Sequence, residues 1–569
     1  MQKDKLDRRD FVKTGTVAAV AAGMAAGCSS AQEEPAAPTA SRYQAEVPDT
    51  LDLAERAALA VNALTGASDP EFKYETFQGG HLDHQPPFMS CLKNGPCLQK
   101  PIQALPRLRI MSGSTLNSDT DRKMVEAVIG TLEEDGLWWL NVEGRPWRAP
   151  FKVDTSWPVA QGRLMVALLD WYQYDGDSKW LELTGRMADG LARIAERNED
   201  RAWYYTAYGR RGKWEAQFFP GEAAETSTNV EPSTVTFYNV GLPLRAFSRW
   251  YALSGDKKAL DMAHRLARFM LKPTMWGARG EEMVVAGEHG RWSGHFHTHT
   301  TGLIGLAEYA IASNDARAKR IVDEAYQHAR SVGISRIGFF PAMIRPASQK
   351  QPSDAGAGGT YPQVSETCGV ADMISLAIRL SESGIGDYWD HVDQYVRNHL
   401  VECQMLRRDL LEEIIAAGPT YEVDPTSETA DNVLERNIGA FVSGSDPTWL
   451  YAWYTMCCQG NGSLALAEAW KAILDHADGV VQVNLLLNRA SPWMDVDSYL
   501  PYEGKVVLKN KRARKIHVRI PSWVDKKAVR CHVNDRPASP HWLSNYLIVE
   551  GLGRSDVVKV EFPVPESTE

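Results

Sequence analysis

The sequence has no basic tract, and its one N-terminal apolar stretch is poorly suited to crossing a membrane. The formal net charge of the 569 residues is −10. Without a lysine- and arginine-rich stretch, we expect no nucleic-acid partner. The apolar stretch is too short and too rich in alanine and glycine for a stable transmembrane helix. These absences favour a protein that acts on neither nucleic acid nor the bilayer interior.

The N-terminus instead resembles an export signal. Arg8 and Arg9, followed by Phe11, precede a short Ala/Val/Gly stretch, as in twin-arginine signals. The stretch ends in "AAGC", a pattern that predicts lipidation of Cys28. Ala25 stands where such signals usually carry leucine. We expect a signal over 1–28, a periplasmic or cell-surface location, and membrane attachment only through this lipid. Ordinary cleavage to a soluble periplasmic protein is the alternative.

Cysteine is scarce, with eight residues in the whole chain. Cys28 belongs to the signal, and Cys91 and Cys97 could close a small disulfide loop in an oxidising compartment. Cys403 and Cys531 fit buried apolar positions in a helix and a strand. Three cysteines therefore need another explanation, and two of them are adjacent.

These three cysteines, with one nearby glutamate, suggest a zinc site. Glu366 and Cys368 form an E-x-C pair, and Cys457 and Cys458 are neighbours in "MCCQGNG". Adjacent cysteines rarely bond to each other because the ring would be strained. Three thiolates and one carboxylate can complete a tetrahedral zinc site, which would protect the thiols from oxidation. Unrelated buried thiols near a surface glutamate are the other interpretation.

A loose helical repeat occupies the first two thirds of the chain. Four segments each show an apolar helix, a turn containing aspartate, and an amphipathic second helix. The turn aspartates are Asp177, Asp256, Asp315 and Asp387, at uneven intervals. Helical hairpins with long variable loops favour a mainly α fold with an (α/α)6-type toroid over 51–475. An irregular solenoid is the alternative.

The flanking segments have different character. Residues 29–50 are rich in serine, alanine, proline and glutamate, which predicts a flexible linker. After about residue 475, short β-branched runs alternate with turn residues. This pattern predicts a C-terminal β-sandwich domain over 476–569.

The cysteine motifs resemble a known enzyme family. "ETC" followed by a helix, and "CCxxN" opening another, resemble the β-L-arabinofuranosidases of glycoside hydrolase family 127. The matching residues are Glu366, Cys368, Cys457, Cys458 and Asn461.

Two further stretches agree with the family, and the resemblance as a whole covers roughly residues 160–565. "HFHTHTTGLIGLAEYAIASND" is similar to its H-x-x-T helix hairpin, at His295 and Thr298. The C-terminal strands resemble its first sandwich domain.

This resemblance implies a retaining glycosidase with a zinc-bound cysteine nucleophile. Cys457 would attack the anomeric carbon, and water would then cleave the glycosyl-cysteine. Glu366, Cys368 and Cys458 would remain zinc ligands. The adjacent cysteines would thus have different roles.

One departure from the family concerns the general acid/base. The family carries a glutamate in a Gly-Glu motif shortly before E-T-C, whereas here the segment from Phe339 to Glu366 contains no earlier glutamate. Asp354 is the one carboxylate there and becomes the candidate. A carboxylate from another loop, or loss of hydrolysis with the zinc site retained, are the alternatives.

Several polar and aromatic residues are candidates for sugar binding. His295, His297 and Thr298 lie in "GHFHTHT", where an extended backbone would suit a metal and a helix start would suit a sugar. His84 lies in the polar stretch "GGHLDHQPP", which predicts either a substrate loop or a solvated one. Trp453 and Asn461 flank the cysteine pair.

We therefore predict an exported zinc-dependent glycoside hydrolase that removes a terminal sugar from a polysaccharide-derived oligosaccharide. Arabinofuranose is the sugar that the resemblance implies, and the member is divergent. Two other functions remain open: a non-catalytic glycan-binding lipoprotein with a structural zinc, and a polysaccharide lyase on the same toroid.

Overall fold

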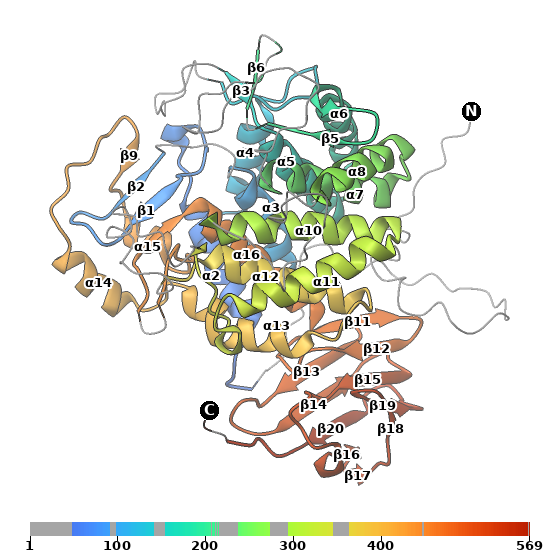
Figure 1. Ribbon diagram of the computed structural model, residues 1–569. Helices are drawn as coiled ribbons and strands as arrows, with labels where there is room; N and C mark the ends of the chain where they lie inside the picture. The colour runs from blue at the N-terminus through green and yellow to red at the C-terminus, as the bar shows by residue number, and fades with distance from the viewer. Residues whose placement is uncertain are drawn as a thin grey trace.

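The computed structural model describes residues 48–91, 98–141, 154–205, 207–210, 237–272, 294–344, 364–446 and 449–566, together with residues 212, 214 and 568. A helical body forms the upper part of the molecule in Figure 1, and a domain of strands, coloured orange to red, lies below it. Within the described residues, no helix combines the length and apolar character needed to span a membrane. The predicted fold class is confirmed.

The helical body is built around a closed ring of inner helices. In the described part of the chain, each of six helices packs against the next, and the sixth packs against the first. This closure distinguishes a toroid from a solenoid. In ring order the helices are α3 (Gln99–Ser112), α5 (Pro158–Asp175), α7 (Phe237–Ser254), α10 (Phe296–Ser313), α12 (Thr367–Glu382) and α16 (Met456–Ala472).

A second layer of helices covers this ring. The four predicted hairpins are the pairs α5–α6, α7–α8, α10–α11 and α12–α13, and α2 packs on both α3 and α16. Asp256 and Asp315 cap α8 and α11 by accepting backbone N–H bonds. The outer helices are α2 (Leu53–Gly66), α4 (Ser118–Ile129), α6 (Lys179–Ile194), α8 (Lys257–Met270), α11 (Ala316–Ser331) and α13 (Trp389–Tyr395).

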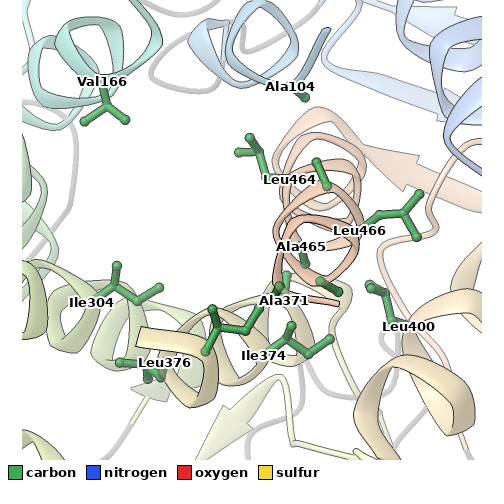
Figure 2. Close-up of a cluster of buried hydrophobic side chains, with 14 of the residues drawn as sticks. Ala104, Val166, Ile304, Ala371, Ile374, Leu376, Leu400, Leu464, Ala465 and Leu466 are labelled. Carbon is green, nitrogen blue, oxygen red and sulfur yellow. The ribbon is translucent and has the colours of Figure 1, made fainter. Parts of the chain in front are cut away.

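The inner helices are buried nearly all round, whereas the outer ones bury one face. Helix α10 has buried residues over most of its length, while α8 buries a single stripe. A helix surrounded by protein needs no polar face, which explains the apolar first halves of the repeats. Figure 2 shows Val166, Ile304 and Leu464, from α5, α10 and α16, pointing toward one shared interior.

Glycine sets the closest approach between two inner helices. A Cβ atom on Gly305 of α10 would lie 2.1 Å from the carbonyl oxygen of Gly241 in α7, and one on Gly241 would lie 2.5 Å from the Cα of Gly302. Any larger residue at Gly305 would push the helices apart.

Charged side chains form a second, ionic ring inside the helical one. Each inner helix contributes one member, and positive and negative charges alternate around the circle, with nitrogen–oxygen distances from 2.6 to 3.8 Å. Arg245 of α7 adds a further positive charge, 3.0 Å from Glu308. The members, in order, are Arg107, Asp170, Arg249, Glu308, Arg379 and Glu468, and the last pairs with the first.

A small antiparallel sheet lies beside the first turn of α16. Its order is β10 (Trp453–Thr455), β1 (Gly79–His81), β2 (Phe88–Ser90) and β9 (Glu428–Thr429). The first three residues of "GGHLDHQPP" therefore form a strand, where the polar composition predicted a loop. Three two-stranded pairs are β3 (Thr155–Ser156) with β6 (Tyr208–Gly209), β4 (Glu196–Arg197) with β5 (Ala202–Trp203), and β7 (Gly294–His295) with β8 (Met343–Ile344).

The C-terminal domain contains two five-stranded sheets. All pairings are antiparallel except that of β12 with β15. One sheet has the order β11 (Leu474–Ala477), β12 (Val480–Val483), β15 (Lys515–Arg519), β19 (Tyr546–Glu550) and β18 (His541–Leu543). The other has the order β13 (Met494–Ser498), β14 (Lys505–Asn510), β20 (Val557–Glu561), β16 (Arg530–Val533) and β17 (Arg536–Pro537).

An arginine joins the two domains. Arg519 of β15 is 4 % exposed at its side chain and pairs with Asp387 at 3.1 Å and Asp390 at 2.6 Å, both at the start of α13. Asp387, one of the predicted turn aspartates, therefore forms an ion pair between the helical body and the C-terminal domain. The remaining short elements are η1 (Pro70–Phe72), η3 (Ser335–Ile337), η5 (Val396–Leu400), η6 (Val401–Cys403), α14 (Arg408–Ala417), α15 (Val433–Asn437) and η7 (Lys526–Ala528).

Candidate metal centre at the helix starts

The candidate site is assembled from the first turns of neighbouring inner helices. Glu366 is the N-cap of α12, with Cys368 in its first turn, and Cys457 and Cys458 follow the N-cap of α16. His295 is the N-cap of α10, and Lys100 lies at the start of α3. The Lys100 ammonium donates a hydrogen bond to the carbonyl oxygen of Cys457 at 3.1 Å. Four helix starts therefore meet at one place.

The four predicted metal ligands lie together. Cys368 Sγ is 3.4 Å from Cys458 Sγ, and Cys457 Sγ is 3.7 Å from Cys458 Sγ. Cys458 Sγ is also 3.4 Å from Glu366 Oε1. One ligand atom from each of the four residues lies within 4.8 Å of all the others. Chain segments 89 or more positions apart thus converge on one cluster.

These spacings match a tetrahedral zinc site. Zinc binds thiolate sulfur at about 2.3 Å and carboxylate oxygen at about 2.0 Å, so tetrahedral geometry separates two sulfurs by about 3.8 Å and a sulfur and an oxygen by about 3.5 Å. The observed separations are 3.7 and 3.4 Å between sulfurs and 3.4 Å between sulfur and oxygen, close to these values. The donor set of three thiols and a carboxylate could therefore hold such an ion.

The three sulfurs differ in accessibility. Cys368 and Cys458 are 0 and 1 % exposed, whereas Cys457 is only partly buried. The Thr455 hydroxyl lies 3.1 Å from Cys457 Sγ. That hydroxyl is in turn 2.9 Å from the hydroxyl of Ser443, whose Oγ accepts the backbone N–H of Thr455 at 2.5 Å. Cys457 is therefore the least buried of the three cysteines, and its sulfur has a defined hydroxyl neighbour.

The protein environment sets the thiols apart in acidity. Burial, together with the neighbouring thiols, raises the pKa of Cys368 well above its ordinary value. For Cys458, burial opposes ionisation, but hydrogen bonds with Cys368 and Cys457 lower its pKa to about 6. A thiol as buried as Cys368 requires a nearby cation to ionise, which is what a bound metal supplies.

His295 orients the carboxylate ligand. Its Nε2–H donates to Glu366 Oε2 at 2.5 Å, while Oε1 of the same carboxylate faces Cys458. The Glu366 charge raises the pKa of His295 to about 9 against the effect of burial. Burial alone would raise the pKa of Glu366, but the His295 charge lowers it to about 2. Thr298 Oγ1 lies 3.4 Å from His295 Nδ1 on the other side of the ring.

A second histidine belongs to a buried network below the first. His297 Nδ1 donates to Asp372 Oδ2 at 2.7 Å, and the hydroxyls of Thr300 and Thr301 donate to the same oxygen at 2.6 and 3.1 Å. Burial lowers the pKa of His297. The neutral ring therefore presents Nε2 as an acceptor, and the Asn461 amide lies 3.5 Å from it.

The other predicted sugar-binding residues lie on two elements, the start of α10 and the small sheet. His295 and His297 begin a helix, as the sugar-binding interpretation of "GHFHTHT" required, and their rings lie 5.6 Å apart. Trp453 in β10 pairs with His81 in β1. His84 lies in the connection after β1, partly exposed. Asp354, the acid/base candidate, lies outside the described residues, as do residues 1–47 and Cys97.

Three residues of the site were missed in the sequence. Asp372 lies four positions after Cys368 in "ETCGVAD", on the same helix face, and that spacing is a usable signal. Thr455 directly precedes the helix that carries the cysteines, where N-cap residues are expected. The sequence around Lys100 does not indicate its role, because the carbonyl that it binds is 357 positions away.

Comparisons with known proteins give structural neighbours only. No family model matches the sequence, and no curated protein matches it. A family 127 β-arabinofuranosidase structure is similar over 90 % of this chain and 76 % of its own, with a TM-score of 0.54 at 16 % identity. The family 127 β-L-arabinofuranosidase of Geobacillus stearothermophilus T6 is similar over 91 % and 76 %, with a TM-score of 0.52 at 15 % identity.

A third structure, described as a glycoside hydrolase, is similar over 88 % of this chain and 80 % of its own, with a TM-score of 0.54 at 13 % identity. At these identities the likeness concerns the fold, and the predicted resemblance is confirmed at that level. The chain has the fold of the family 127 β-L-arabinofuranosidases, with a Glu-Cys-Cys-Cys cluster that can hold a metal ion at the start of its inner helices.

Proposed function

We propose that the protein is a retaining glycoside hydrolase in which Cys457 is the nucleophile and Glu366, Cys368 and Cys458 help to hold a zinc ion. The observation that carries this proposal is the difference in burial within the sulfur cluster. Cys368 and Cys458 are enclosed, while Cys457 is partly exposed at the start of an inner helix. A purely structural zinc site has no need of an accessible sulfur.

Zinc bound there would supply positive charge that keeps the thiols ionised at neutral pH. The chain itself contributes the start of α16, whose partial positive charge also favours a thiolate at Cys457. Thr455 can donate its hydroxyl to this sulfur and hold it in one orientation. Lys100, bonded to the Cys457 carbonyl, places a cation nearby.

The reaction would proceed in two displacements. The Cys457 sulfur bonds to the anomeric carbon while the glycosidic C–O bond breaks and a general acid protonates the departing oxygen. Water, deprotonated by the same group, then bonds to that carbon and the C–S bond breaks. Asp354 is our candidate for the acid/base. His295, Thr298, His297, Asn461, Trp453 and His84 are candidates for contacts with sugar hydroxyls and rings.

The substrate would be a terminal sugar on a polysaccharide-derived oligosaccharide, with β-L-arabinofuranoside as the first choice. The support is the fold shared with structures described as arabinofuranosidases. We further propose that the protein is exported by the twin-arginine route and anchored through a lipid at Cys28, on the evidence of the N-terminal motif.

The test combines metal analysis with hydrolysis. About one zinc ion per chain is expected in the purified protein, with turnover of an aryl β-L-arabinofuranoside and retention of configuration at the anomeric carbon. Cys457→Ser should keep most of the zinc and lose activity by about a thousandfold or more. Cys531→Ser, a buried thiol in the sandwich, is the matched control and should change neither.

A binding protein with a structural zinc is the second candidate. The observation that favours it is that four protein ligands already complete a tetrahedron, as in structural zinc sites. In that case zinc would be present, no aryl glycoside in a broad panel would be hydrolysed, and Cys457→Ser would weaken zinc binding and stability alone.

A further inference from the structure

A second group of metal-ligating side chains lies on the small sheet beside the centre. His81 ends β1, and Asp83 and His84 follow it. One ligand atom from each of the three lies within 4.8 Å of the others. His84 Nδ1 is 2.8 Å from Asp83 Oδ1, and His81 Nδ1 is 3.9 Å from the same oxygen. The side chains are 34, 40 and 27 % exposed, so an ion in solution can reach them.

The backbone holds this group in one shape. The N–H of Leu82 bonds to the carbonyl of Ala452 at 2.9 Å, and the N–H of Gln85 bonds to that of Pro419 at 2.9 Å. Gly418 approaches so closely that a Cβ there would lie 2.5 Å from the carbonyl oxygen of Asp83. The backbone of residues 82–85 is therefore held by contacts on both sides. This places the metal-ligating side chains close together before any ion binds.

The surroundings also fix the imidazoles and favour a cation. The His81 ring stacks on Phe88 at 4.7 Å between centroids, Phe88 stacks on Tyr421 at 3.9 Å, and His84 meets Tyr421 edge-on at 5.5 Å. Glu428 is buried nearby, bonded to the Tyr421 hydroxyl at 3.0 Å, and its charge acts on His81. Two carboxylates beside two histidines attract a positive ion.

We propose that His81, Asp83 and His84 form a second metal site, which binds a divalent transition ion such as Zn²⁺. Two imidazoles and one carboxylate are a donor set that such ions prefer. Three protein ligands leave coordination positions open, so this ion would bind more weakly than the one held by three thiolates and exchange with solution. The ion would replace the Asp83–His84 hydrogen bond.

The position of this second site connects it to the first. Strand β1 pairs with β10, so that Gly79 is opposite Thr455 and His81 is opposite Trp453. Thr455 contacts Cys457, and His81 lies two residues along the strand from Gly79, or about 7 Å. On the proposed function, oxygen atoms of a saccharide bound at Cys457 could fill the open positions of the ion.

The experiment measures metal binding directly and needs no enzyme assay. The full-length protein is dialysed against a weak chelator that leaves the thiolate-bound metal in place, and Zn²⁺ is then titrated in a calorimeter. We expect one further ion per chain. His84→Gln and, separately, His81→Gln should each weaken this uptake at least tenfold, while His541→Gln, on the exposed strand β18, should not change it.

Metal retained by the thiolate centre reports that each variant has folded. Cys458→Ser, which damages the first centre, should still bind the exchangeable ion, so failure of one site is distinguishable from failure of the other. The proposal is overturned if the wild-type protein takes up no further ion, or if both histidine variants bind it as tightly as the wild type.

Discussion

At the scale of single residues, the adjacent cysteines differ in what surrounds them. Successive residues in a helix point about 100° apart, so Cys457 and Cys458 cannot share one environment. Cys458 faces the interior, between Cys368 and Glu366, while Cys457 lies beside Thr455 on the accessible side. Two identical side chains therefore have different surroundings, because they occupy successive positions at the start of one helix.

Asp372 is the residue on which the polar network beneath the centre depends. One carboxylate oxygen accepts hydrogen bonds from His297, Thr300 and Thr301. Asp372→Asn replaces a charged acceptor by a neutral amide, and we expect a loss of about 1–3 kcal/mol in the free energy of unfolding. Denaturant unfolding measures this loss, and the zinc content should stay unchanged.

Thr300→Val is the matched variant for this network, because it removes one hydrogen bond and leaves the carboxylate in place. Its loss should be about 1 kcal/mol. An Asp372→Asn protein as stable as the wild type would show that the network contributes little to folding.

At the scale of elements, the contact between α7 and α10 is the most sensitive to side-chain size. Gly305→Ala places a methyl group 2.1 Å from a backbone oxygen of α7, which only a shift of the helices can relieve. We expect a loss of about 3 kcal/mol or more in the free energy of unfolding.

Gly185→Ala in α6 is the control. There the new methyl group would meet the Trp250 ring at 3.5 Å, an ordinary contact. Because alanine favours a helix over glycine by about 1 kcal/mol, this variant should be neutral or slightly stabilised. Thermal unfolding of both proteins distinguishes close packing from a general effect of glycine replacement.

Helix α13 carries a histidine from which we predict a pH-dependent stability. His391 accepts a hydrogen bond from the Tyr326 hydroxyl at 3.1 Å and stacks on Tyr388. Burial, aided by Arg330, lowers its pKa to about 4 from an ordinary 6.5. The unfolded chain therefore takes up the proton first, and the stability present above pH 6.5 is lost as the pH falls toward 4.

We expect this one group to lower the free energy of unfolding by about 2 kcal/mol between pH 7 and pH 5. His391→Gln, which keeps an acceptor for Tyr326 but does not titrate, should lose less stability over the same range. Urea unfolding at the two pH values makes the comparison. Identical losses in both proteins would contradict the assignment to His391.

The elements that could be predicted from the sequence are those whose pattern is local. The four helical hairpins repeat a helix, a turn and an amphipathic helix, and each of them forms. The strands β12, β14, β15, β16, β19 and β20 lie in the β-branched runs after residue 475, and most of them alternate buried with less buried residues.

The elements that were missed depend on distant partners. Strand β13, "MDVDS", carries two aspartates, a residue type that is uncommon in strands, and both are buried because they pair with Lys511 and Lys509 at 2.6 Å. Helix α3 contains Pro101 and Pro106, which weaken its helical signal. Strand β1 has the sequence Gly-Gly-His, which has little strand character, and it lies between the nearby β2 and β10, more than 370 positions away. The ligand cluster was predictable only because its motifs resemble a family; the spacing of the thiols alone left the zinc site undecided.

At the scale of the whole molecule, the alternating ionic ring ties all six inner helices together. Glu468 contacts Arg379 at 2.9 Å and Arg107 at 3.3 Å, and these cations hold its pKa well below the ordinary value despite burial. Glu468→Gln would remove one of the two carboxylate partners of each arginine, leaving Arg107 with Asp170 and Arg379 with Glu308, and would add one unbalanced positive charge to a largely buried ring. We expect a loss of about 3–5 kcal/mol in the free energy of unfolding.

Glu412→Gln is the control, because Glu412 forms an exposed pair with Arg408 on one helix. Its removal should cost less than about 0.5 kcal/mol. Guanidinium would screen charges, so urea is the denaturant of choice. Equal effects for the two substitutions would mean that the ring is not a stabilising unit.

Closure of the helical ring between α3 and α16 also bears on how the protein is made. The two helices that meet there, at Lys100 and Cys457, are 357 positions apart. At ribosomal speeds of about 5–20 residues per second, α3 waits roughly 20–70 seconds for its partner. During that interval the ring of inner helices is incomplete, and the apolar surface of α3 that packs on α16 is uncovered. Because Cys457 and Cys458 arrive on the last of the six inner helices, a tightly held metal ion would mark chains whose ring is complete, and this would suit the twin-arginine export that we propose.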